Sequence, residues 1–235
     1  MDWYWIVLII VAGLIAWVVL SALLYKQFFK RFYDIFLSGL ALLLLSPVFL
    51  LLSVLVGIKL GKPIVYKANR TGKNNLEFCL YKFRSMTNER DADGNLLPDT
   101  KRLTKFGKVL RASSLDELPE LVNIFLGHMS IVGPRPLPTI YLPYYSKEEI
   151  HRHDIRPGLT GWAQVNGRNS IKWEQKFKFD LDYLDRVSLF FDLKIILLTI
   201  EKVFKREGIG QGEEHPGSLN ELRSRGSNDN PEEAD

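Results

Sequence analysis

The chain has 235 residues, a formal net charge of +4 and a mean hydropathy near zero. This length allows one sizeable domain with attached segments. Its single cysteine, Cys79, excludes an internal disulfide and is typical of a reducing compartment.

The charge is unevenly distributed along the chain. From Glu207 onward, eight acids face only Arg223 and Arg225, a net of −6, so residues 1–206 carry +10. A basic body suits anionic substrates and the anionic face of a membrane. A nucleic-acid partner is not expected, because no recognition motif or basic helix accompanies the charge.

The first apolar segment runs from Trp3 to Leu24 without a charged residue. A helix of this length rises about 33 Å, enough to cross the hydrocarbon core of a bilayer. A secretory signal peptide is the alternative, but Met1-Asp2-Trp3 lacks its basic start. The basic cluster that follows, Lys26, Lys30 and Arg31, predicts that this end is cytoplasmic. We therefore predict that residues 1–29 form a transmembrane or membrane-anchoring helix.

The second apolar segment, Ile35 to Ile58, has basic residues on both flanks and Ser46-Pro47 at its middle. If it crossed the membrane, one basic flank would lie on the wrong side. Proline removes a backbone hydrogen bond and bends a helix. Two hypotheses remain open from these residues: a re-entrant helix that leaves by the face it entered, and a Pro-kinked span, which membrane helices tolerate.

After Pro63 the pattern is that of a soluble domain. Short strands are expected at Ile64–Tyr66 and Phe78–Phe83, around the turn Thr71–Asn75. The other expected elements are a loop at Asp91–Pro98, a helix after Ser114, a short helix at Tyr144–His153, an irregular Gly158–Asn169, and helices at Lys172–Leu184 and Leu189–Arg206.

The last predicted helix and the tail have different characters. Leu189–Arg206 mixes apolar residues with Lys194, Lys202 and Lys205, so it suits either a membrane interface or the protein core. The tail after it is polar and acidic, and we predict that residues 207–235 are disordered.

Asp116 and Glu117 are the strongest candidates for chemistry. Ser114-Leu115-Asp116-Glu117 also fits a capping box, with acids in the first turn of a helix. The cations and rigid turns nearby favour a second role. Asp116 can attack phosphorus as a carboxylate nucleophile, and Glu117 can hold Mg²⁺, with Asp116 as a further oxygen ligand. A helix N-terminus would offset the charge of a diphosphate.

Several cations are candidates for binding that phosphate. Arg135 stands between two prolines in Gly133-Pro134-Arg135-Pro136, so its guanidinium is held in a fixed direction. The other phosphate candidates are Lys82, Arg84, Arg111, Arg156 and Arg168. His151 and His153 are not expected to bind metal, because side chains two residues apart diverge on a helix.

Four long motifs, in this order, resemble the bacterial sugar transferases, the monotopic phosphoglycosyl transferases, and most closely their small PglC-like type. The resemblance covers about residues 30–206. Its motifs are Leu80–Met86, Arg111–Glu120, Met129–Pro136 and Arg156–Asn169.

The resemblance implies a reaction and roles for residues. Such enzymes move a sugar 1-phosphate from a UDP-sugar to a polyprenol phosphate, commonly undecaprenyl phosphate, and release UMP. By similarity Asp116 is the covalent nucleophile and Glu117 binds Mg²⁺. Lys82, Arg111 and Arg135 then help to hold the phosphates.

The resemblance also implies an architecture. The family has a re-entrant membrane helix bent at a Ser-Pro pair, matching Ser46 and Pro47, with a basic pair and an aspartate before it, matching Lys30, Arg31 and Asp34. We expect an α+β fold: a mostly helical membrane-associated domain with a small β-hairpin or sheet, a re-entrant helix at residues 30–62, and a catalytic domain at 63–206. Residues 1–25 depart from the smallest members, which begin near the re-entrant helix.

The implied location is the bacterial inner membrane, with the catalytic domain on its cytoplasmic face. The bilayer, the UDP-sugar and the polyprenol phosphate are the expected partners, and a homodimer or downstream glycosyltransferases are left open. The sugar is not readable from the sequence, although family likeness favours an N-acetylated or diacetamido sugar. Polysaccharide, lipopolysaccharide and glycoprotein assembly all fit.

Two competing hypotheses remain. One is a catalytically silent membrane adaptor of a glycan-assembly complex, against which the intact Asp116-Glu117 pair argues. The other is a direct transfer in which Asp116 acts only as a base.

Overall fold

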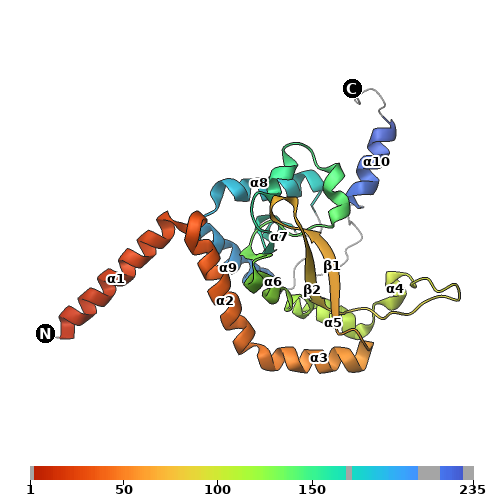
Figure 1. Cartoon of the computed structure of the whole chain (residues 1–235), viewed down its shortest axis with the longest axis horizontal. Helices are drawn as coiled ribbons and strands as arrows, with labels where there is room; N and C mark the ends of the chain where they lie inside the picture. The colour runs from red at the N-terminus through yellow and green to blue at the C-terminus, as the bar shows by residue number, and fades with distance from the viewer. Residues whose placement is uncertain (1–2, 168–170, 206–217, 230–235) are drawn as a thin grey trace.

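Three apolar helices at the N-terminal end lead into a small α+β body (Figure 1). The structure, a computed structural model, describes residues 3–167, 171–205 and 218–229. The chain begins with α1 (Trp3–Leu23), passes through a π-helical turn (Tyr25–Phe29), and continues as α2 (Lys30–Leu44) and α3 (Ser46–Leu60). The predicted combination of a mostly helical fold with a small sheet is confirmed.

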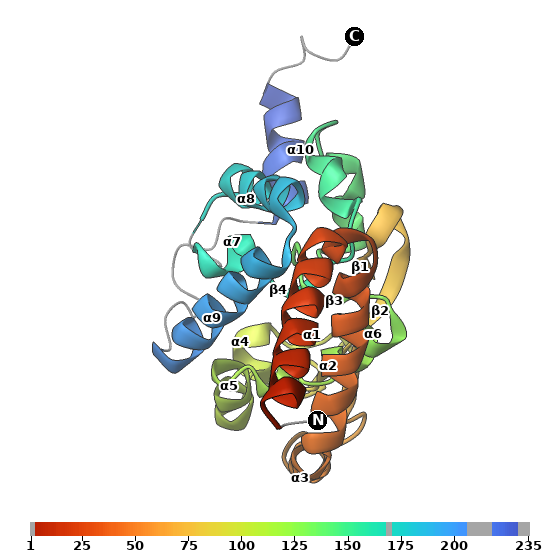
Figure 2. The same ribbon diagram turned by 90° about the vertical axis from the view of Figure 1, so that its left-hand side faces the viewer.

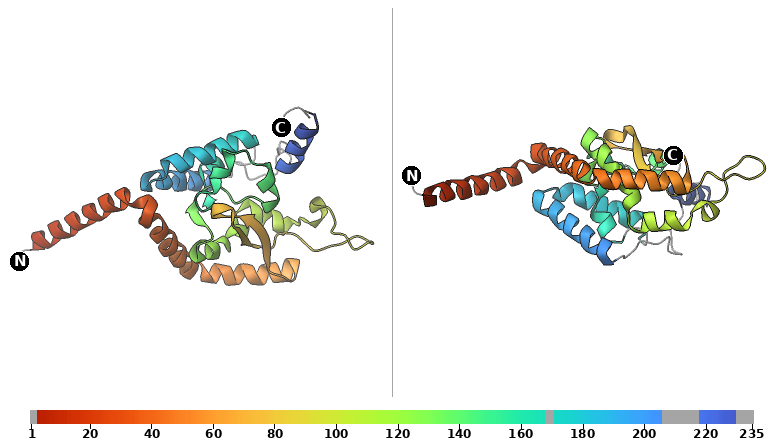
Figure 3. Two further views of the ribbon diagram at one scale, coloured as in Figure 1. Left: turned by 45° about the horizontal axis from the view of Figure 1, so that its top comes forward. Right: turned by 90° about the horizontal axis from the view of Figure 1, so that it is seen from below.

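Helix α1 projects away from the body, as both views of Figure 3 show. Its side chains are exposed along almost the whole length, and among the described helices it alone is long and apolar enough to cross a membrane by itself. Only its C-terminal end packs, where Trp17 Nε1 donates to the Tyr33 hydroxyl over 3.2 Å and Ser21 Oγ lies 2.9 Å from the same oxygen. The predicted N-terminal apolar helix is therefore present.

Helices α2 and α3 meet at a sharp bend. The helix pair that they form is bent by 64°, with the break at Leu45 and Pro47 in the first turn of α3. Proline is suited to this position, because the first turn of a helix needs no N–H donor there. Ser46 Oγ donates to the Leu43 carbonyl over 2.8 Å and so satisfies an acceptor at the break. The bend predicted at Ser46-Pro47 is confirmed.

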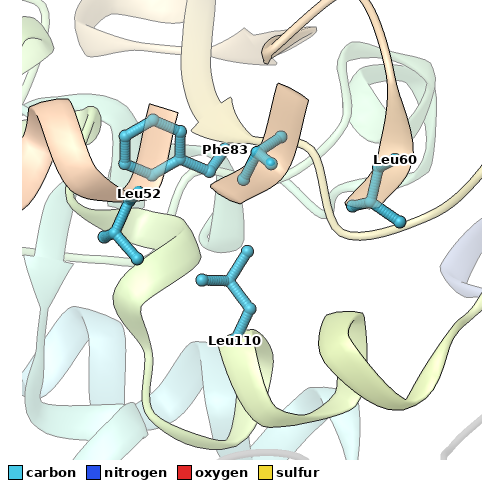
Figure 4. Packing of buried hydrophobic residues seen from close by; sticks show 5 residues of the cluster. Leu52, Leu60, Phe83 and Leu110 are labelled. Carbon is cyan, nitrogen blue, oxygen red and sulfur yellow. The ribbon is translucent and has the colours of Figure 1, made fainter. Parts of the chain in front are cut away.

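Helix α3 packs one side against the body and leaves the other side bare. Leu52 and Leu60 contact Phe83 and Leu110 in a buried cluster (Figure 4). The opposite side of the helix exposes Leu50, Leu51, Val54 and Ile58. Helix α3 is therefore apolar on both its packed side and its exposed side.

An antiparallel hairpin forms one side of the body. Strands β1 (Val65–Thr71) and β2 (Glu77–Phe83) pair in register from Val65 opposite Phe83 to Thr71 opposite Glu77. The connecting turn places Asn74 and Asn75 at positive φ, which asparagine tolerates. Both predicted strands are confirmed, and β1 continues further than expected.

Helix α6 (Glu120–Leu126) is fixed to β2 by one side chain that makes hydrogen bonds to the β2 backbone, as a neighbouring strand would. The fully buried Asn123 accepts from the Tyr81 N–H through Oδ1 over 3.0 Å and donates to the Cys79 carbonyl through Nδ2 over 2.7 Å. This pairing holds Lys82, the next residue of β2, beside the start of α6.

A second, parallel pair of strands is formed by β3 (Ser130–Val132) and β4 (Gly158–Thr160). Figure 2 shows them between the β1–β2 hairpin and the helices α7 (Trp162–Val165), α8 (Trp173–Arg186) and α9 (Leu189–Lys205). The expectation of irregular structure at Gly158–Asn169 is wrong for β4 and α7, because pairing with the distant β3 orders this glycine-rich stretch. Predicted α8 and α9 are confirmed.

The remaining elements are short. Helices α4 (Asp99–Arg102) and α5 (Lys105–Ala112) precede the acid pair, and 3₁₀ turns occupy Thr139–Tyr144 and Glu149–His153. The helix expected over Tyr144–His153 is therefore a 3₁₀ turn over its second half.

Helix α9 buries one side in the body and exposes apolar side chains on the other. Its Asp192 and Ile195 are buried in the body, whereas Phe190, Leu193, Leu197 and Ile200 are exposed.

The tail contains a helix where we expected disorder. Residues Leu219–Asp229 form α10, and Leu219 is 1% exposed in a cluster with Trp173 and Phe177. The expectation is wrong for this stretch, because a segment too polar to fold alone is held by contacts with the body. The rest of the predicted tail lies outside the described residues.

Candidate active site

Asp116 and Glu117 lie on a tight turn before α6. Ser114 adopts the left-handed conformation, with φ 56° and ψ 16°, and Leu115–Glu117 form a single 3₁₀ turn. The Ser114 side chain makes no cap hydrogen bond, so the capping box is wrong. The helix begins only at Glu120, after Pro119, so the expected helix N-terminus is not at the acid pair. A left-handed serine is strained, and such strain is a frequent feature of functional sites.

Glu117 is held by two cations from different parts of the chain. Lys82 Nζ of β2 lies 2.7 Å from Glu117 Oε1, and Arg135 Nη2 forms an ion pair with the same oxygen. Burial raises the pKa of Glu117, but Arg135 and Lys82 outweigh it and lower that pKa to about 2. Glu117 is therefore a carboxylate throughout the physiological range.

Asp116 is buried without a direct partner. Its side chain is 8% exposed, and among the described residues no group forms a hydrogen bond or ion pair with its carboxylate. Burial raises the pKa of Asp116, Glu117 raises it further, and Lys82, Arg111 and Arg135 oppose the shift. The Asp116 oxygens are thus surrounded by positive charge but not engaged by it.

Glu120 is a third carboxylate that the sequence analysis did not single out. It is fully buried at the start of α6, with Lys82 Nζ 3.2 Å from its Oε1. Burial and the charge of Glu117 raise the pKa of Glu120 to about 7. Lys82 is therefore shared between an ionised Glu117 and a Glu120 that gains or loses its proton near neutral pH.

Arg135 is braced through its backbone by a buried ion pair. Arg152, 2% exposed, donates through Nη2 to the Arg135 carbonyl over 2.8 Å, and its Nε and Nη2 also donate to Asp180 Oδ2. The Gly133 N–H donates to the Thr160 carbonyl over 2.9 Å and ties the same loop to β4. The conformation of the loop at residues 133–136 therefore depends on contacts with residues far away in sequence, as well as on its two prolines.

An open cleft joins these groups to further cations. Arg111 lies beside Asp116 and donates to Ser85 Oγ over 2.8 Å. Arg70 and Lys176 cannot be recognised from the sequence, because a single basic residue in a strand or helix has no distinguishing pattern. Burial lowers the pKa of both side chains. The cations lining the cleft with Asp116 and Glu117 include Arg70, Lys82, Arg111, Arg135 and Lys176.

Two predicted phosphate ligands, Arg84 and Arg156, donate to backbone carbonyls instead, although Arg84 also lines the cleft. Arg84 is buried and donates to the carbonyls of Leu60, Lys62, Pro63 and Met86, so it fixes the end of α3 instead. Arg156 donates to the Gly127 carbonyl over 2.8 Å, at the far end of α6. Arg168 lies outside the described residues.

The residues expected at the membrane boundary tie α2 to the body. Lys30 Nζ lies 2.6 Å from Asp192 Oδ2 and 2.9 Å from the Val132 carbonyl. Arg31 donates to the carbonyls of Ile124 and Phe125 at the end of α6, and Asp34 Oδ1 accepts from the Ile131 N–H. These contacts fix the position of α2 relative to the acid pair.

The carboxylates suit a magnesium ion better than a fully protein-bound metal. The described residues contain no group of three or more His, Cys, Asp or Glu side chains able to enclose a metal. Asp116 and Glu117 offer two neighbouring carboxylates, and Mg²⁺ is commonly bound by one or two carboxylates together with water and substrate phosphate. The donor set therefore fits Mg²⁺.

Comparison with known proteins identifies a family that matches most of the chain. The sequence model of a family described as bacterial sugar transferase matches residues 25–206. The uncharacterized sugar transferase EpsL of Bacillus subtilis is 50% identical over 182 residues, which cover 77% of this chain and 90% of EpsL.

Two larger relatives are named for an activity. The UDP-glucose:undecaprenyl-phosphate glucose-1-phosphate transferase of Escherichia coli is 38% identical over 76% of this chain, and the UDP-N-acetylgalactosamine-undecaprenyl-phosphate N-acetylgalactosaminephosphotransferase of Aeromonas hydrophila is 35% identical over 75%. The matched parts are 41% and 44% of those two proteins.

Proposed function

The chain belongs to the bacterial sugar transferase family, and from this premise we propose that it transfers a sugar 1-phosphate from a UDP-sugar to undecaprenyl phosphate. The observation that supports it most is the buried Asp116 carboxylate, unpaired, beside a Glu117 fixed by Lys82 and Arg135. A nucleophile needs free oxygens, and a diphosphate needs fixed cations.

The proposed reaction has two displacements. The Asp116 carboxylate attacks the phosphorus that bears the sugar, the bond from that phosphorus to the bridging oxygen breaks, and UMP leaves. A phosphate oxygen of the polyprenol phosphate then attacks the same phosphorus and releases the Asp116 carboxylate. The product is a polyprenol diphosphate sugar, and Asp116 returns to its starting state.

The surrounding residues have separate parts in this scheme. Arg135, Lys82 and Arg111 bind and orient the phosphates, and Glu117 with Asp116 would hold Mg²⁺. A bound Mg²⁺ supplies charge neutralisation on the diphosphate. Glu117 cannot easily replace Asp116 as nucleophile, because its carboxylate is already hydrogen-bonded to Lys82 and Arg135.

The proposed location is the cytoplasmic face of the inner membrane. We place α1 across the bilayer and treat α2–α3 as a re-entrant helix, with the exposed apolar sides of α3 and α9 toward lipid. A soluble UDP-sugar and a lipid-bound phosphate can meet only at the membrane surface, so the acid pair would lie just above the hydrocarbon.

A UMP-release assay tests the reaction and identifies the sugar. Purified protein is given Mg²⁺, undecaprenyl phosphate and each of several UDP-sugars, including glucose and N-acetylated donors, because the relatives are named for both. We expect release with at least one donor, an N-acetylated one on family likeness. Asp116→Asn should abolish release, and the matched control Asp185→Asn, at an exposed position on α8, should not.

The outcomes separate the competing hypotheses. No release with any donor would favour the silent adaptor. Substantial release by the Asp116→Asn variant would contradict the covalent route.

A further inference from the structure

Helix α10 lies beyond residues 25–206, the part of the chain that matches the family, yet it docks specifically on the body. Leu219 is 1% exposed between side chains of the body. Arg223 donates to both oxygens of Glu149, over 2.6 and 2.7 Å, and to the Tyr144 carbonyl. A bidentate pair of this kind gives directional as well as electrostatic fixation.

The surface that receives α10 is a wall of the catalytic cleft. Leu219 packs with Leu137, Tyr141 and Trp173, and these three residues line the cleft that also contains Asp116, Glu117 and Arg135. Leu137 follows Arg135 by two residues. The docked helix therefore packs against the segment that carries Arg135, the proposed phosphate-binding residue.

Ser218, immediately before α10, is part of the same cleft lining. Its Oγ is buried and has no hydrogen-bond partner among the residues that the structure describes. A buried hydroxyl without a partner is unfavourable, and nearly all such groups in proteins are satisfied by something. Rotation about the Cα–Cβ bond turns Oγ to another staggered position, where a ligand in the cleft can supply the missing partner.

The position of α10 indicates which substrate it meets. Figures 1 and 2 both show α10 at the end of the molecule opposite α3, away from the bend proposed to enter the membrane. A polyprenol chain must approach from the lipid side, whereas a water-soluble nucleotide sugar can enter from this end. Tyr141 and Trp173, which line the cleft, together with a hydroxyl suit a hydroxylated ring better than a hydrocarbon chain.

We propose that Ser218 and α10 complete a binding site for a hydroxylated ring of the nucleotide-sugar donor, with the Ser218 hydroxyl as its hydrogen-bonding group. The ring is either the ribose or the transferred hexose, which share this chemistry. This inference rests on the proposed function, because it assumes a donor whose diphosphate lies at Arg135.

The first test is Ser218→Ala in the full chain. Removal of an unpaired hydroxyl should leave the melting temperature unchanged. Loss of one neutral hydrogen bond to the donor should raise KM for the UDP-sugar by about 2- to 10-fold, with kcat and KM for undecaprenyl phosphate unaltered. An unchanged donor KM, or a rise confined to the acceptor, would overturn the proposal.

A matched pair of leucines on α10 gives the second test. Leu219→Ser should undock the helix and raise the donor KM at least as much as Ser218→Ala. Leu222→Ser is the control, since Leu222 is 45% exposed, and it should behave as wild type. Equal effects of the two substitutions would contradict a role for the docked helix.

Calorimetric titration with UDP and with the UDP-sugar, done in an Asp116→Asn background so that the donor binds without reacting, distinguishes the two rings. Weaker binding of both ligands to Ser218→Ala places the ribose at this site, and weaker binding of the UDP-sugar alone places the hexose there. If UDP and the UDP-sugar both bind to Ser218→Ala with undiminished affinity, the inference is wrong. Release of UMP by the wild type would still leave the proposed function intact. Absence of UMP release by the wild type is the separate failure of the function itself.

Discussion

Asp116 and Glu117 are neighbours in sequence, but their surroundings give them opposite properties. Glu117 receives two cations and its pKa falls to about 2, whereas Asp116 is buried with no direct partner and its pKa rises, first through burial. Two acids with divergent pKa values are a recurrent sign of divided roles in catalysis. At the residue scale, this difference leaves the Asp116 carboxylate without a partner and keeps Glu117 ionised and bound to Lys82 and Arg135.

Lys82→Met tests the role of the lysine that is bound to Glu117 and Glu120. We expect a fall in activity of about 100-fold, the size typical for loss of one group that stabilises developing charge. The variant should also be less stable, because Glu120 loses its ion-pair partner. Adding Glu120→Gln should restore the melting temperature without restoring UMP release. Recovery of activity in the double variant would show that Lys82 serves only to neutralise Glu120.

Glu120 makes stability depend on pH in a defined window. Its pKa is about 7 in the folded chain against 4.5 when unperturbed, so between these values the folded state holds a proton that the unfolded state has lost. Stability contributed by this group is present below pH 4.5 and is lost as pH rises to 7, by on the order of 3 kcal/mol. Chemical denaturation of wild type and Glu120→Gln at several pH values measures it. A constant difference between the two proteins across this window would contradict the assignment.

At the element scale, buried polar groups hold α2, α8 and α9 together. Asp192 of α9 accepts from Lys30 of α2, from Tyr25 over 2.6 Å and from Tyr183 of α8 over 2.7 Å. Through these contacts, the helices proposed to lie at the membrane are fixed to the catalytic body. The height of the active site above the lipid should depend on this junction.

Asp192→Leu should therefore destabilise the protein strongly. It leaves the largely buried Lys30 ammonium and two hydroxyls without their acceptor, and breaking a buried ion pair costs about 3–5 kcal/mol. Asp185→Leu, on the exposed surface of α8, is the matched control and should change little. Thermal denaturation in detergent compares them, and equal melting temperatures would refute the structural role.

The elements differ in how far the sequence predicted them. The β1–β2 hairpin, α8, α9 and the bend at Ser46-Pro47 follow from local periodicity and from proline. Strands β3 and β4 have three residues each and pair across a long loop, so no local pattern predicts them. The acid pair was found, but its 3₁₀ turn was not, because the left-handed Ser114 depends on tertiary contacts. The Arg152–Asp180 ion pair and α10 likewise depend on tertiary contacts, so the sequence did not predict them.

For the whole molecule, the proposed membrane placement implies a fixed orientation at the bilayer. Helix α1, the bend between α2 and α3, and the exposed apolar side of α9 present the lipid-compatible surfaces, and α10 lies at the opposite end from α3 (Figure 1). A donor from the cytosol and an acceptor from the lipid would then reach one cleft from two directions. Such an arrangement suits two successive displacements at a single carboxylate.

Cysteine labelling tests this orientation. In a Cys79→Ser background, single substitutions Gln27→Cys and Lys59→Cys flank the α2–α3 pair at exposed positions. A re-entrant helix predicts that a membrane-impermeant maleimide labels both from the cytoplasmic side, while Tyr4→Cys is labelled from the other side. Labelling of positions 27 and 59 from opposite sides would establish a kinked span instead.

The covalent step can be observed by intact-protein mass spectrometry. Wild-type protein is incubated with Mg²⁺ and the active UDP-sugar in the absence of undecaprenyl phosphate. We expect one added sugar-phosphate group, located on Asp116 by peptide mapping, absent from Asp116→Asn, and removed when undecaprenyl phosphate is supplied. Rapid UMP release in the presence of undecaprenyl phosphate with no such adduct in its absence, or an adduct on another residue, would contradict the assignment of Asp116 as the nucleophile.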